Sequence, residues 1–320
     1  MEGVAVNSSD LNNLRRANLG QPSLQQSTSP LPLTEALQHC HGLGPVRLAA
    51  LQQAGVRSWH DAVADPDRIP GALRSHLLQE CDRLLTALAD DNIQYFVDRL
   101  LPPDRWRILT QYIDRASYFD IETTGLEYDD TITTIVCWHK GALHSFVEHE
   151  NLDDFLDLLD DIDLLVSFNG STFDVPRVLD GFHIPDLPCP HLDLRWPCHY
   201  KDLRGGLKQV TSRLGFQRPA DLQDADGELA VRLWSLWQHK KDTAAREQLI
   251  RYCAADVLLL IPLAQHVAGH EVMPVDELWP HLPDAAPVEQ NVDPMEKRRR
   301  LLEQQFGSAS PKRLRTWRRR

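Results

Sequence analysis

Two acidic residues stand one position apart in the stretch YFDIETTGL, residues 118–126. In a β-strand, residues i and i+2 point to the same side, so Asp120 and Glu122 would project together. Two neighbouring carboxylates repel each other, and one of them keeps its proton unless a cation lies between them. A divalent metal removes this conflict and prefers oxygen ligands. An isolated pair of this kind also occurs at ordinary exposed strand ends, so further acids must decide the chemistry.

A third acid follows another apolar run, in LLVSFNGSTFDVP at residues 164–176. The length and composition of the run predict a buried strand, and Asn169 with Gly170 favours a tight turn after it. Asp174 comes next, and Pro176 fits the first turn of a following helix. Taken alone, the pattern fits equally well an Asp that complements a helix dipole.

A fourth acid lies in the apolar stretch LIRYCAADVLLL, residues 249–260. Tyr252 and Asp256 are four positions apart, so they share one face of a predicted helix. An acid among apolar residues needs a partner. That partner is either a metal shared with the first two acids or a nearby arginine such as Arg251.

The three stretches, in this order and at this spacing, resemble the exonuclease motifs of the DEDD superfamily, which has a ribonuclease H-like fold. The YxxxD spacing resembles its tyrosine subclass, because the histidine subclass would have His where this chain has Arg251. Three further segments are similar to the YprB-type ribonuclease H-like domain: TTGL after the first acid pair, GGLKQVTSRLG at 205–215 and AVRLW at 230–234. The resemblance covers residues 105–268.

This resemblance implies a metal-dependent nuclease, a 3′–5′ exonuclease that uses two Mg²⁺ or Mn²⁺ ions. The implied metal ligands are Asp120, Glu122, Asp174 and Asp256. Tyr252 would orient the attacking water. The residues with implied substrate contacts are Thr123, Thr124, Gly125 and Asn169. For Asn169, a purely structural role in its own turn stays open.

The implied partner is a nucleic acid, DNA or RNA, with a single-stranded end. Two alternatives to the exonuclease remain. One is a nucleic-acid-binding scaffold whose ribonuclease H-like domain no longer cuts. The other is a structure-specific endonuclease on the same fold, because two-metal chemistry does not itself require a chain end.

The elements that must position these residues predict an α/β fold. Between residues 116 and 149 lie three short runs rich in β-branched and aromatic residues, and HKG at 139–141 predicts a hairpin turn. Strands and helices then alternate, with a helix over 152–161 for which Asn151 is the expected cap. Beyond residue 205 the chain is mostly helical. We expect a mixed sheet flanked by helices.

Residues 34–100 predict a small all-α domain in front of this sheet, because apolar residues recur every three or four positions. The segment GLGP at 42–45 resembles the helix-hairpin-helix family, in which Gly-apolar-Gly joins two short helices. Gly42 and Gly44 would let backbone N–H groups approach a phosphate, and Arg47 would add a positive charge. Such contacts would bind the nucleic-acid backbone without reading its sequence. The same hairpin also serves packing or protein contacts.

The two ends of the chain differ from its middle in composition. Residues 1–33 are rich in Ser, Asn, Gln and Pro and are predicted to be a disordered leader. Residues 269–320 are predicted to be a linker rich in Pro and acids followed by a basic tail. Segment 297–320 has ten Lys and Arg and one acid, a net charge of +9. The whole chain carries −12, so the other 296 residues carry −21. Such a tail suits a polyanionic partner, or is simply solvated.

Composition also excludes several classes of protein. The six cysteines contain no CxxC pair, which argues against a disulfide framework or a zinc site. No apolar stretch approaches the ~20 residues needed to span a bilayer. The first residues lack the basic start and apolar core of a secretory signal. We therefore expect a cytoplasmic location and no membrane partner, while protein partners stay unspecified.

Overall fold

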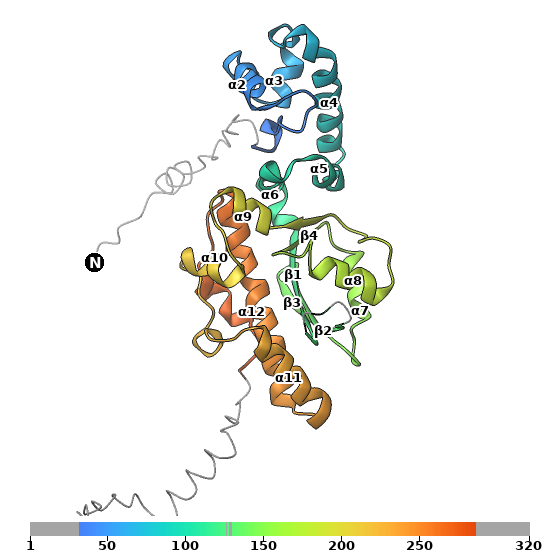
Figure 1. Cartoon of the computed structure of the whole chain (residues 1–320), viewed down its shortest axis with the longest axis vertical. Helices are drawn as coiled ribbons and strands as arrows, with labels where there is room; N and C mark the ends of the chain where they lie inside the picture. Colours follow the sequence, from blue (N-terminus) through green and yellow to red (C-terminus); the bar gives the residue numbers. More distant parts are fainter. Residues whose placement is uncertain (1–31, 126, 128–129, 286–320) are drawn as a thin grey trace, which may run out of the picture.

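A five-stranded mixed sheet forms the centre of the computed structural model, which describes residues 32–125, 127 and 130–285 (Figure 1). The strand order is β3-β2-β1-β4-β5. The strands are β1 (Ala116–Thr123), β2 (Ile132–His139), β3 (Ala142–Val147), β4 (Leu164–Ser167) and β5 (His191–Asp193). The β1–β2 and β2–β3 pairs are antiparallel, whereas β1–β4 and β4–β5 are parallel. The predicted α/β class with a mixed sheet is confirmed.

The loops that flank β3 give one confirmed and one wrong prediction. Lys140 and Gly141 join β2 to β3 with φ values of 47° and 84°, the left-handed pair that a two-residue hairpin needs. The helix α7 (Asp154–Leu159) begins later than predicted, and Asn151 does not cap it. Instead the Asn151 side chain accepts a hydrogen bond from the Val147 N–H at 2.9 Å, and so closes the loop after β3.

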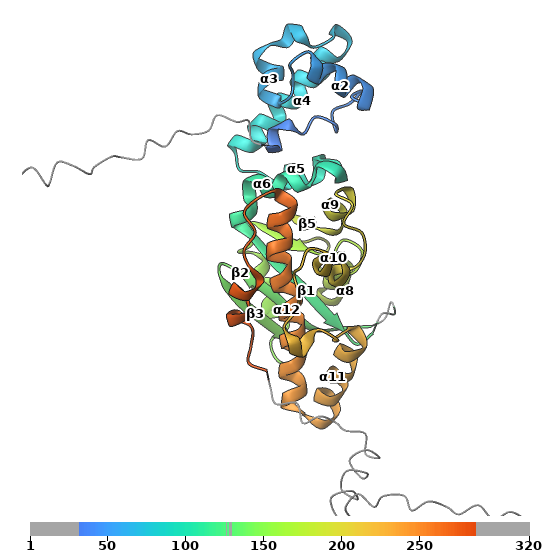
Figure 2. The same ribbon diagram turned by 90° about the vertical axis from the view of Figure 1, so that its left-hand side faces the viewer.

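Helices cover both faces of the sheet (Figure 2). The long helix α12 (Thr243–Ala268) packs against β1 and β2 on one face, beside α11 (Gly227–Lys240). Helix α7 and helix α8 (Asp174–Phe182) pack on the other face. Along β1, Tyr118 belongs to the hydrophobic cluster of α12, whereas Phe119 and Ile121 belong to the cluster of α7 and α8. Alternation along a strand therefore directs Asp120 and Glu122 toward α12.

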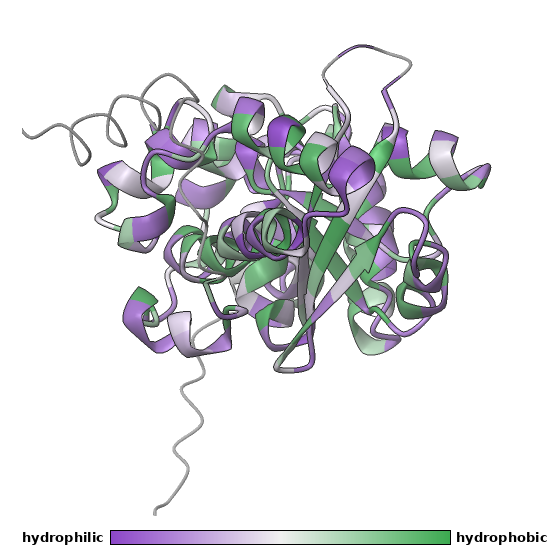
Figure 3. Ribbon diagram, turned by 90° about the horizontal axis from the view of Figure 1, so that it is seen from below, coloured by the Kyte–Doolittle hydropathy of each residue, from purple (hydrophilic) through white to green (hydrophobic). Residues whose placement is uncertain are grey.

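Helix α12 is long and apolar enough to cross a membrane, but 83% of its most apolar window is buried inside the protein. A helix so covered serves as the core of the domain. Figure 3 shows hydrophobic colouring concentrated in the sheet and the helix turns next to it, with hydrophilic residues toward the outside. An acid on α12 therefore lies in an apolar setting, as its sequence predicted.

The N-terminal module is helical, as predicted. Its elements are the 3-10 helices η1 (Pro32–Glu35) and η2 (Pro66–Arg68) and the helices α2 (Pro45–Gln53), α3 (Trp59–Ala64), α4 (Gly71–Ala89) and α5 (Ile93–Arg99). The hairpin resemblance predicts an α-helix on each side of Gly42–Gly44. The structure contains the second, α2, while residues 36–44 before it form turns and loops.

Helix α6 (Trp106–Tyr112) joins the module to the sheet domain, with the short 3-10 helices η3 (Pro102–Asp104) and η4 (Ile113–Arg115) on either side. It contacts both η1 and α12. One hydrophobic cluster runs through the module, α6 and the α12 face of the sheet, from Leu33 to Leu282. The boundary expected near residue 100 is therefore not a gap in the core.

Smaller elements complete the domain: α9 (Arg195–Tyr200), α10 (Leu207–Arg213), η5 (Ala220–Leu222), η6 (Val275–Glu277) and η7 (Trp279–His281). The segment after residue 268, expected as a linker, folds back on the sheet as far as the described residues go. The His281 ring lies 4.9 Å from that of Trp138 on β2, and Leu278 is buried. The predicted leader up to residue 31 and the basic tail at 297–320 lie outside the described residues.

Candidate metal centre

Asp120 and Glu122 lie together near the end of β1, half-buried on the α12 side. One oxygen of each carboxylate and the sulfur of Cys253 on α12 all lie within 4.8 Å of one another. The Cys253 thiol donates to the Asp120 carbonyl oxygen at 3.4 Å, and its sulfur is 3.7 Å from Asp120 Oδ2. The predicted side-by-side arrangement is confirmed. Sequence reasoning missed Cys253, although its place three residues before Asp256 puts it on the same helix face.

Asp256 on α12 is 7% exposed and forms a two-point ion pair with an arginine that sequence reasoning did not single out. Arg218 donates from Nε and Nη2 to the two Asp256 oxygens, each at 2.6 Å. The guanidinium carbon also lies 4.8 Å from the centre of the Tyr252 ring. Arg251, named from sequence as a partner for Asp256, instead donates to Asp221 at 2.8 Å. The expected arginine was wrong, and the true partner is 38 positions away.

Asp174 begins α8 and is 3% exposed. The turn before it contains Asn169 in a left-handed conformation, φ 70°. Asp193 at the end of β5 accepts a hydrogen bond from the Asn169 N–H at 2.7 Å and so fixes this turn. A Cβ at Gly170 would lie 2.1 Å from the Ser167 hydroxyl, so only glycine fits there. Asp193, which the sequence showed only as part of a strand, positions the loop that delivers Asp174.

All four acids have raised pKa values. Burial raises the pKa of Asp120 and Glu122 well above the usual range, and the neighbouring carboxylates raise both further. Burial, with a smaller effect of Asp193, raises the pKa of Asp174 to about 7. Burial also raises the pKa of Asp256, although the Arg218 guanidinium opposes the shift. Such a cluster either retains protons near neutral pH or requires a cation.

Tyr252 lies one helical turn before Asp256 on α12 and is buried. Burial raises the pKa of its phenol, and the Asp256 carboxylate raises it further. The hydroxyl therefore keeps its proton at neutral pH and is suited to donate a hydrogen bond. It is a poor proton acceptor in this state.

These residues fit a divalent metal. Their donor atoms are mainly carboxylate oxygens, the ligands that Mg²⁺ and Mn²⁺ prefer, and a bound cation would offset the repulsion that raises their pKa values. Asp256 is already balanced by Arg218, so a metal there would compete with the guanidinium. Asp120 and Glu122 have no such two-point ion pair within the described part of the chain.

The remaining predicted substrate residues of β1 and its loop are engaged in local contacts. The Thr123 hydroxyl donates to the Gly125 carbonyl at 2.5 Å, and the Thr124 hydroxyl donates to Asp130 at 2.8 Å. A Cβ at Gly125 would lie 2.5 Å from the Asp130 carboxylate. These residues therefore shape the loop next to the acids. Asn169 has the turn role and also lines a pocket described below.

The structure does not bring Gly42, Gly44 and Arg47 to the acids. They lie at the start of α2 in the helical module (Figure 1). Gly44 precedes α2 as its cap, and Arg47 donates from Nη1 to the Gly42 carbonyl at 3.0 Å. Gly42 has φ 83°, which favours glycine at that turn.

A sequence model of the RNase_H superfamily matches residues 117–268, a range that contains the four acids, Tyr252 and Arg218. A solved structure of the family B DNA polymerase from the hyperthermophilic archaeon Pyrobaculum calidifontis is similar over 48% of this chain and 27% of that chain. The match thus spans about a quarter of the polymerase, at 18% identity and a TM-score of 0.37. No curated protein matches the chain. The matched family and the mixed five-stranded sheet agree on a ribonuclease H-like α/β fold.

Proposed function

We propose that this protein is a divalent-metal-dependent nuclease that hydrolyses phosphodiester bonds in DNA or RNA as a 3′–5′ exonuclease of the DEDD tyrosine type. The observation that carries the proposal is the convergence of four buried or half-buried acids from β1, α8 and α12, all with raised pKa values. The match to the RNase_H superfamily over the same elements supports it.

The residues divide the work by their chemistry. Divalent ions in such a site supply a Lewis acid for the phosphodiester and activate water. Asp120, Glu122 and Asp256 would hold one ion, and Asp174 with Asp120 a second. Tyr252, which keeps its proton, would orient the attacking water through a hydrogen bond.

Arg218 balances Asp256 before any metal binds. Because its guanidinium engages both carboxylate oxygens at 2.6 Å, an ion that takes a lone pair used by the guanidinium would displace that hydrogen bond. The arginine would then face the same cluster with a free donor. Such a donor suits a phosphate oxygen.

A binding scaffold that does not cut is the second candidate, and the same ion pair favours it. Arg218 occupies one of the four expected metal ligands with good two-point geometry. In that case the protein would hold nucleic acid while its acid cluster stayed partly protonated. The scaffold and the nuclease differ in whether the nucleic acid is cleaved when a divalent metal is present.

The test uses purified protein with 5′-labelled and 3′-labelled single-stranded DNA and RNA, in Mg²⁺, Mn²⁺ or EDTA. The matched variants are Asp120→Asn and Asp157→Asn; Asp157 is an exposed acid on α7. We expect metal-dependent laddering that shortens strands from the 3′ end, is lost in Asp120→Asn and is unchanged in Asp157→Asn.

Other outcomes separate the alternatives. Cleavage of a circular single strand, which has no end, would identify an endonuclease. A mobility shift without cleavage, retained in Asp120→Asn, would identify the scaffold. Neither outcome is compatible with the proposed exonuclease.

A further inference from the structure

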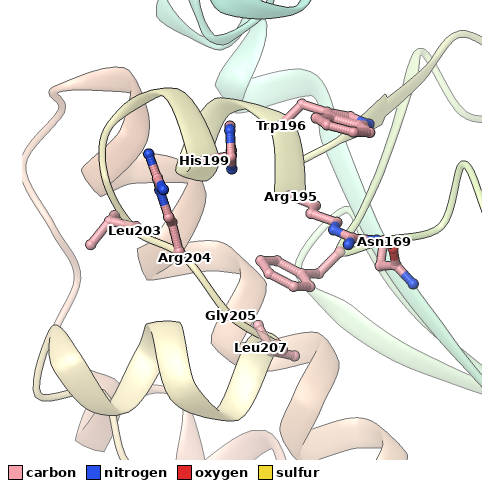
Figure 4. A pocket seen from close by; sticks show the side chains of 10 residues that line it. Asn169, Arg195, Trp196, His199, Leu203, Arg204, Gly205 and Leu207 are labelled. Carbon is pink, nitrogen blue, oxygen red and sulfur yellow. Dashed lines mark hydrogen bonds between the residues drawn. The ribbon is translucent and has the colours of Figure 1, made fainter.

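A pocket of about 580 Å³ opens between the end of β4 and the loop that leads into α10 (Figure 4). Its lining combines three features that suit nucleic acid: aromatic rings, arginine side chains and the exposed backbone of glycines. The aromatic and basic residues that line it are Phe168, Arg195, Trp196, His199 and Arg204. Aromatic faces next to positive charge are the features by which proteins hold single strands.

The pocket lies in a basic segment of an otherwise acidic body. Residues 195–213 contain five Lys and Arg and a single acid, Asp202. The basic residues are Arg195, Lys201, Arg204, Lys208 and Arg213. The first 296 residues as a whole carry −21, so this segment is a local reversal of charge. A polyanion approaching the acid cluster would be attracted to this segment.

Two side chains on one side of the pocket, Arg204 and His199, are exposed to a ligand. Arg204 is exposed, and its contact with the exposed Asp202 at 3.7 Å is weak. His199 is also exposed. Figure 4 shows Arg204 and His199 on one side of the pocket and Arg195 beside Asn169 on the other. Arg195 donates to the side-chain oxygen of Asn169 and is held in place by it, whereas Arg204 has only the weak contact with Asp202 among the described residues.

Both walls of the pocket continue into the metal centre. On one wall, Asn169 belongs to the turn that delivers Asp174. On the other wall, the loop runs into α10, which contacts α12, the helix that carries Asp256. A strand whose phosphate lay at the acids would therefore have the pocket as its neighbour.

We propose that this pocket holds the single strand next to the bond to be cut, with Arg204 on a phosphate and the His199 and Trp196 rings against a base. The inference rests on the proposed nuclease function and names a substrate subsite for it. Stacking on aromatic rings tolerates any base, so the subsite would bind strands with little sequence preference.

The test measures binding separately from cleavage. The parent protein is Asp120→Asn, and the probes are fluorescein-labelled dT20, U20 and a blunt duplex, followed by anisotropy in Mg²⁺ and in EDTA over a salt series. Arg204→Ala is compared with Arg204→Lys and with Arg232→Ala, which removes the same charge from an exposed position on α11. Single abasic sites along dT20, tested with and without His199→Ala, locate the stacked base.

We expect Arg204→Ala to weaken single-strand binding about fivefold and to reduce the salt slope by about 0.7, the value for one phosphate contact. Arg204→Lys should keep most of the slope, and Arg232→Ala should match the parent. One abasic position should weaken binding to the parent and have little further effect in His199→Ala. The duplex should bind less tightly than the single strands.

Three outcomes would overturn the inference. If Arg204→Ala binds like the parent while the wild-type protein still cuts in Mn²⁺, the subsite is wrong and the proposed function stands. If no abasic position weakens binding, the stacking contact is wrong. If the parent binds no probe and the wild-type protein cuts none, the subsite and the proposed function fail together.

Discussion

The helical module and the sheet domain both bury carboxylates, but they treat them in opposite ways. In the module, Glu80 on α4 accepts hydrogen bonds from Arg99 Nε at 2.5 Å and Nη2 at 3.0 Å. His39 and Arg83 each lie 3.8 Å from it. The hydrogen bonds from Arg99 hold the pKa of Glu80 below its usual range. In the sheet domain, Asp256 is the one acid of the four that has a two-point ion pair among the described residues, with Arg218, and the pKa values of all four acids are raised.

This difference distinguishes a structural charge from a functional one. Around Glu80 the protein itself supplies the counter-ions, so the carboxylate stabilises the folded state. Around Asp120 and Glu122 the protein gathers negative charge and leaves it unbalanced, which costs stability. Unbalanced groups of this kind collect at functional sites.

The largest effect should come from removing one charge of the metal centre. Asp120→Asn should lower hydrolysis by at least about a thousandfold, because groups that act as a unit fail together. In EDTA the same variant should unfold at a higher temperature than the wild type, because one repulsive charge is gone. Nuclease assays and thermal unfolding in EDTA check both parts. A loss of activity accompanied by a lower unfolding temperature would contradict the view that the unbalanced charge of Asp120 costs stability.

In the module, removing a charge should destabilise the protein, the opposite of the effect expected in the metal centre. Arg99→Met leaves Glu80 buried without its main partner and should reduce the free energy of unfolding by about 2 kcal/mol, below the 3–5 kcal/mol of a fully buried pair. The smaller value follows because the Arg99 side chain is 48% exposed. Urea unfolding measures it. Arg83→Met, which removes a more distant and 56% exposed partner, is the control and should change stability little.

Arg218→Ala should sharpen the comparison by removing the guanidinium that forms the two-point ion pair with Asp256. We expect the protein to bind Mn²⁺ about tenfold more tightly, because a charged two-point contact no longer competes for Asp256. Calorimetric titration of Mn²⁺ measures this. Arg218→Lys keeps the positive charge but loses the two-point contact. Its Mn²⁺ affinity should lie between those of the wild type and Arg218→Ala. An unchanged Mn²⁺ affinity in Arg218→Ala would mean that Arg218 does not compete with metal.

The smallest effect is the dependence of stability on pH. The pKa of Glu80 is lowered in the folded state. Its contribution to the free energy of unfolding is therefore present above 4.5, the pKa in the unfolded chain, and is lost as the pH falls through the pKa in the folded state. The pKa of Asp174 is raised to about 7, so its contribution is present at low pH and is lost as pH rises through that value.

The protein in EDTA should therefore be most stable at mildly acidic pH and lose stability between about pH 4 and pH 7, the interval between the unfolded Asp174 pKa of 3.8 and the folded value of about 7. The loss is at most about 1.4 kcal/mol per pH unit for each carboxylate that ionises. Added Mn²⁺ should reduce this loss of stability with rising pH. Urea unfolding at a series of pH values provides the measurement, and a flat profile in EDTA would contradict the charges assigned to the centre.

Much of this arrangement could be predicted from local sequence. The i, i+2 spacing placed Asp120 and Glu122 on one side of β1, and the i, i+4 spacing placed Tyr252 and Asp256 on one helix face. The hairpin turn and the mixed sheet also follow from local patterns. Each of these depends on periodicity within one element, which a sequence displays directly.

The rest depends on contacts between distant segments. Arg218 reaches Asp256 across 38 positions, and Asp193 fixes the turn at Asn169 across 24. The spacing that suggested Arg251 for Asp256 was misleading, because its side chain finds Asp221 instead. The predicted cap at Asn151 failed for a similar reason, since its side chain found the end of β3.

The hydrophobic cluster that passes through α6 also bears on how this protein can be divided. Phe96 of α5 stacks on Tyr112 of α6 at 6.2 Å, and α6 in turn lies against α12, the helix that carries two of the site residues. A fragment that starts at residue 105 would keep all four acids of the metal centre but would expose the face of α6 that α5 and η1 cover. Calorimetry of the full chain should accordingly show one melting transition for the module and the sheet domain, and the shortened fragment should aggregate.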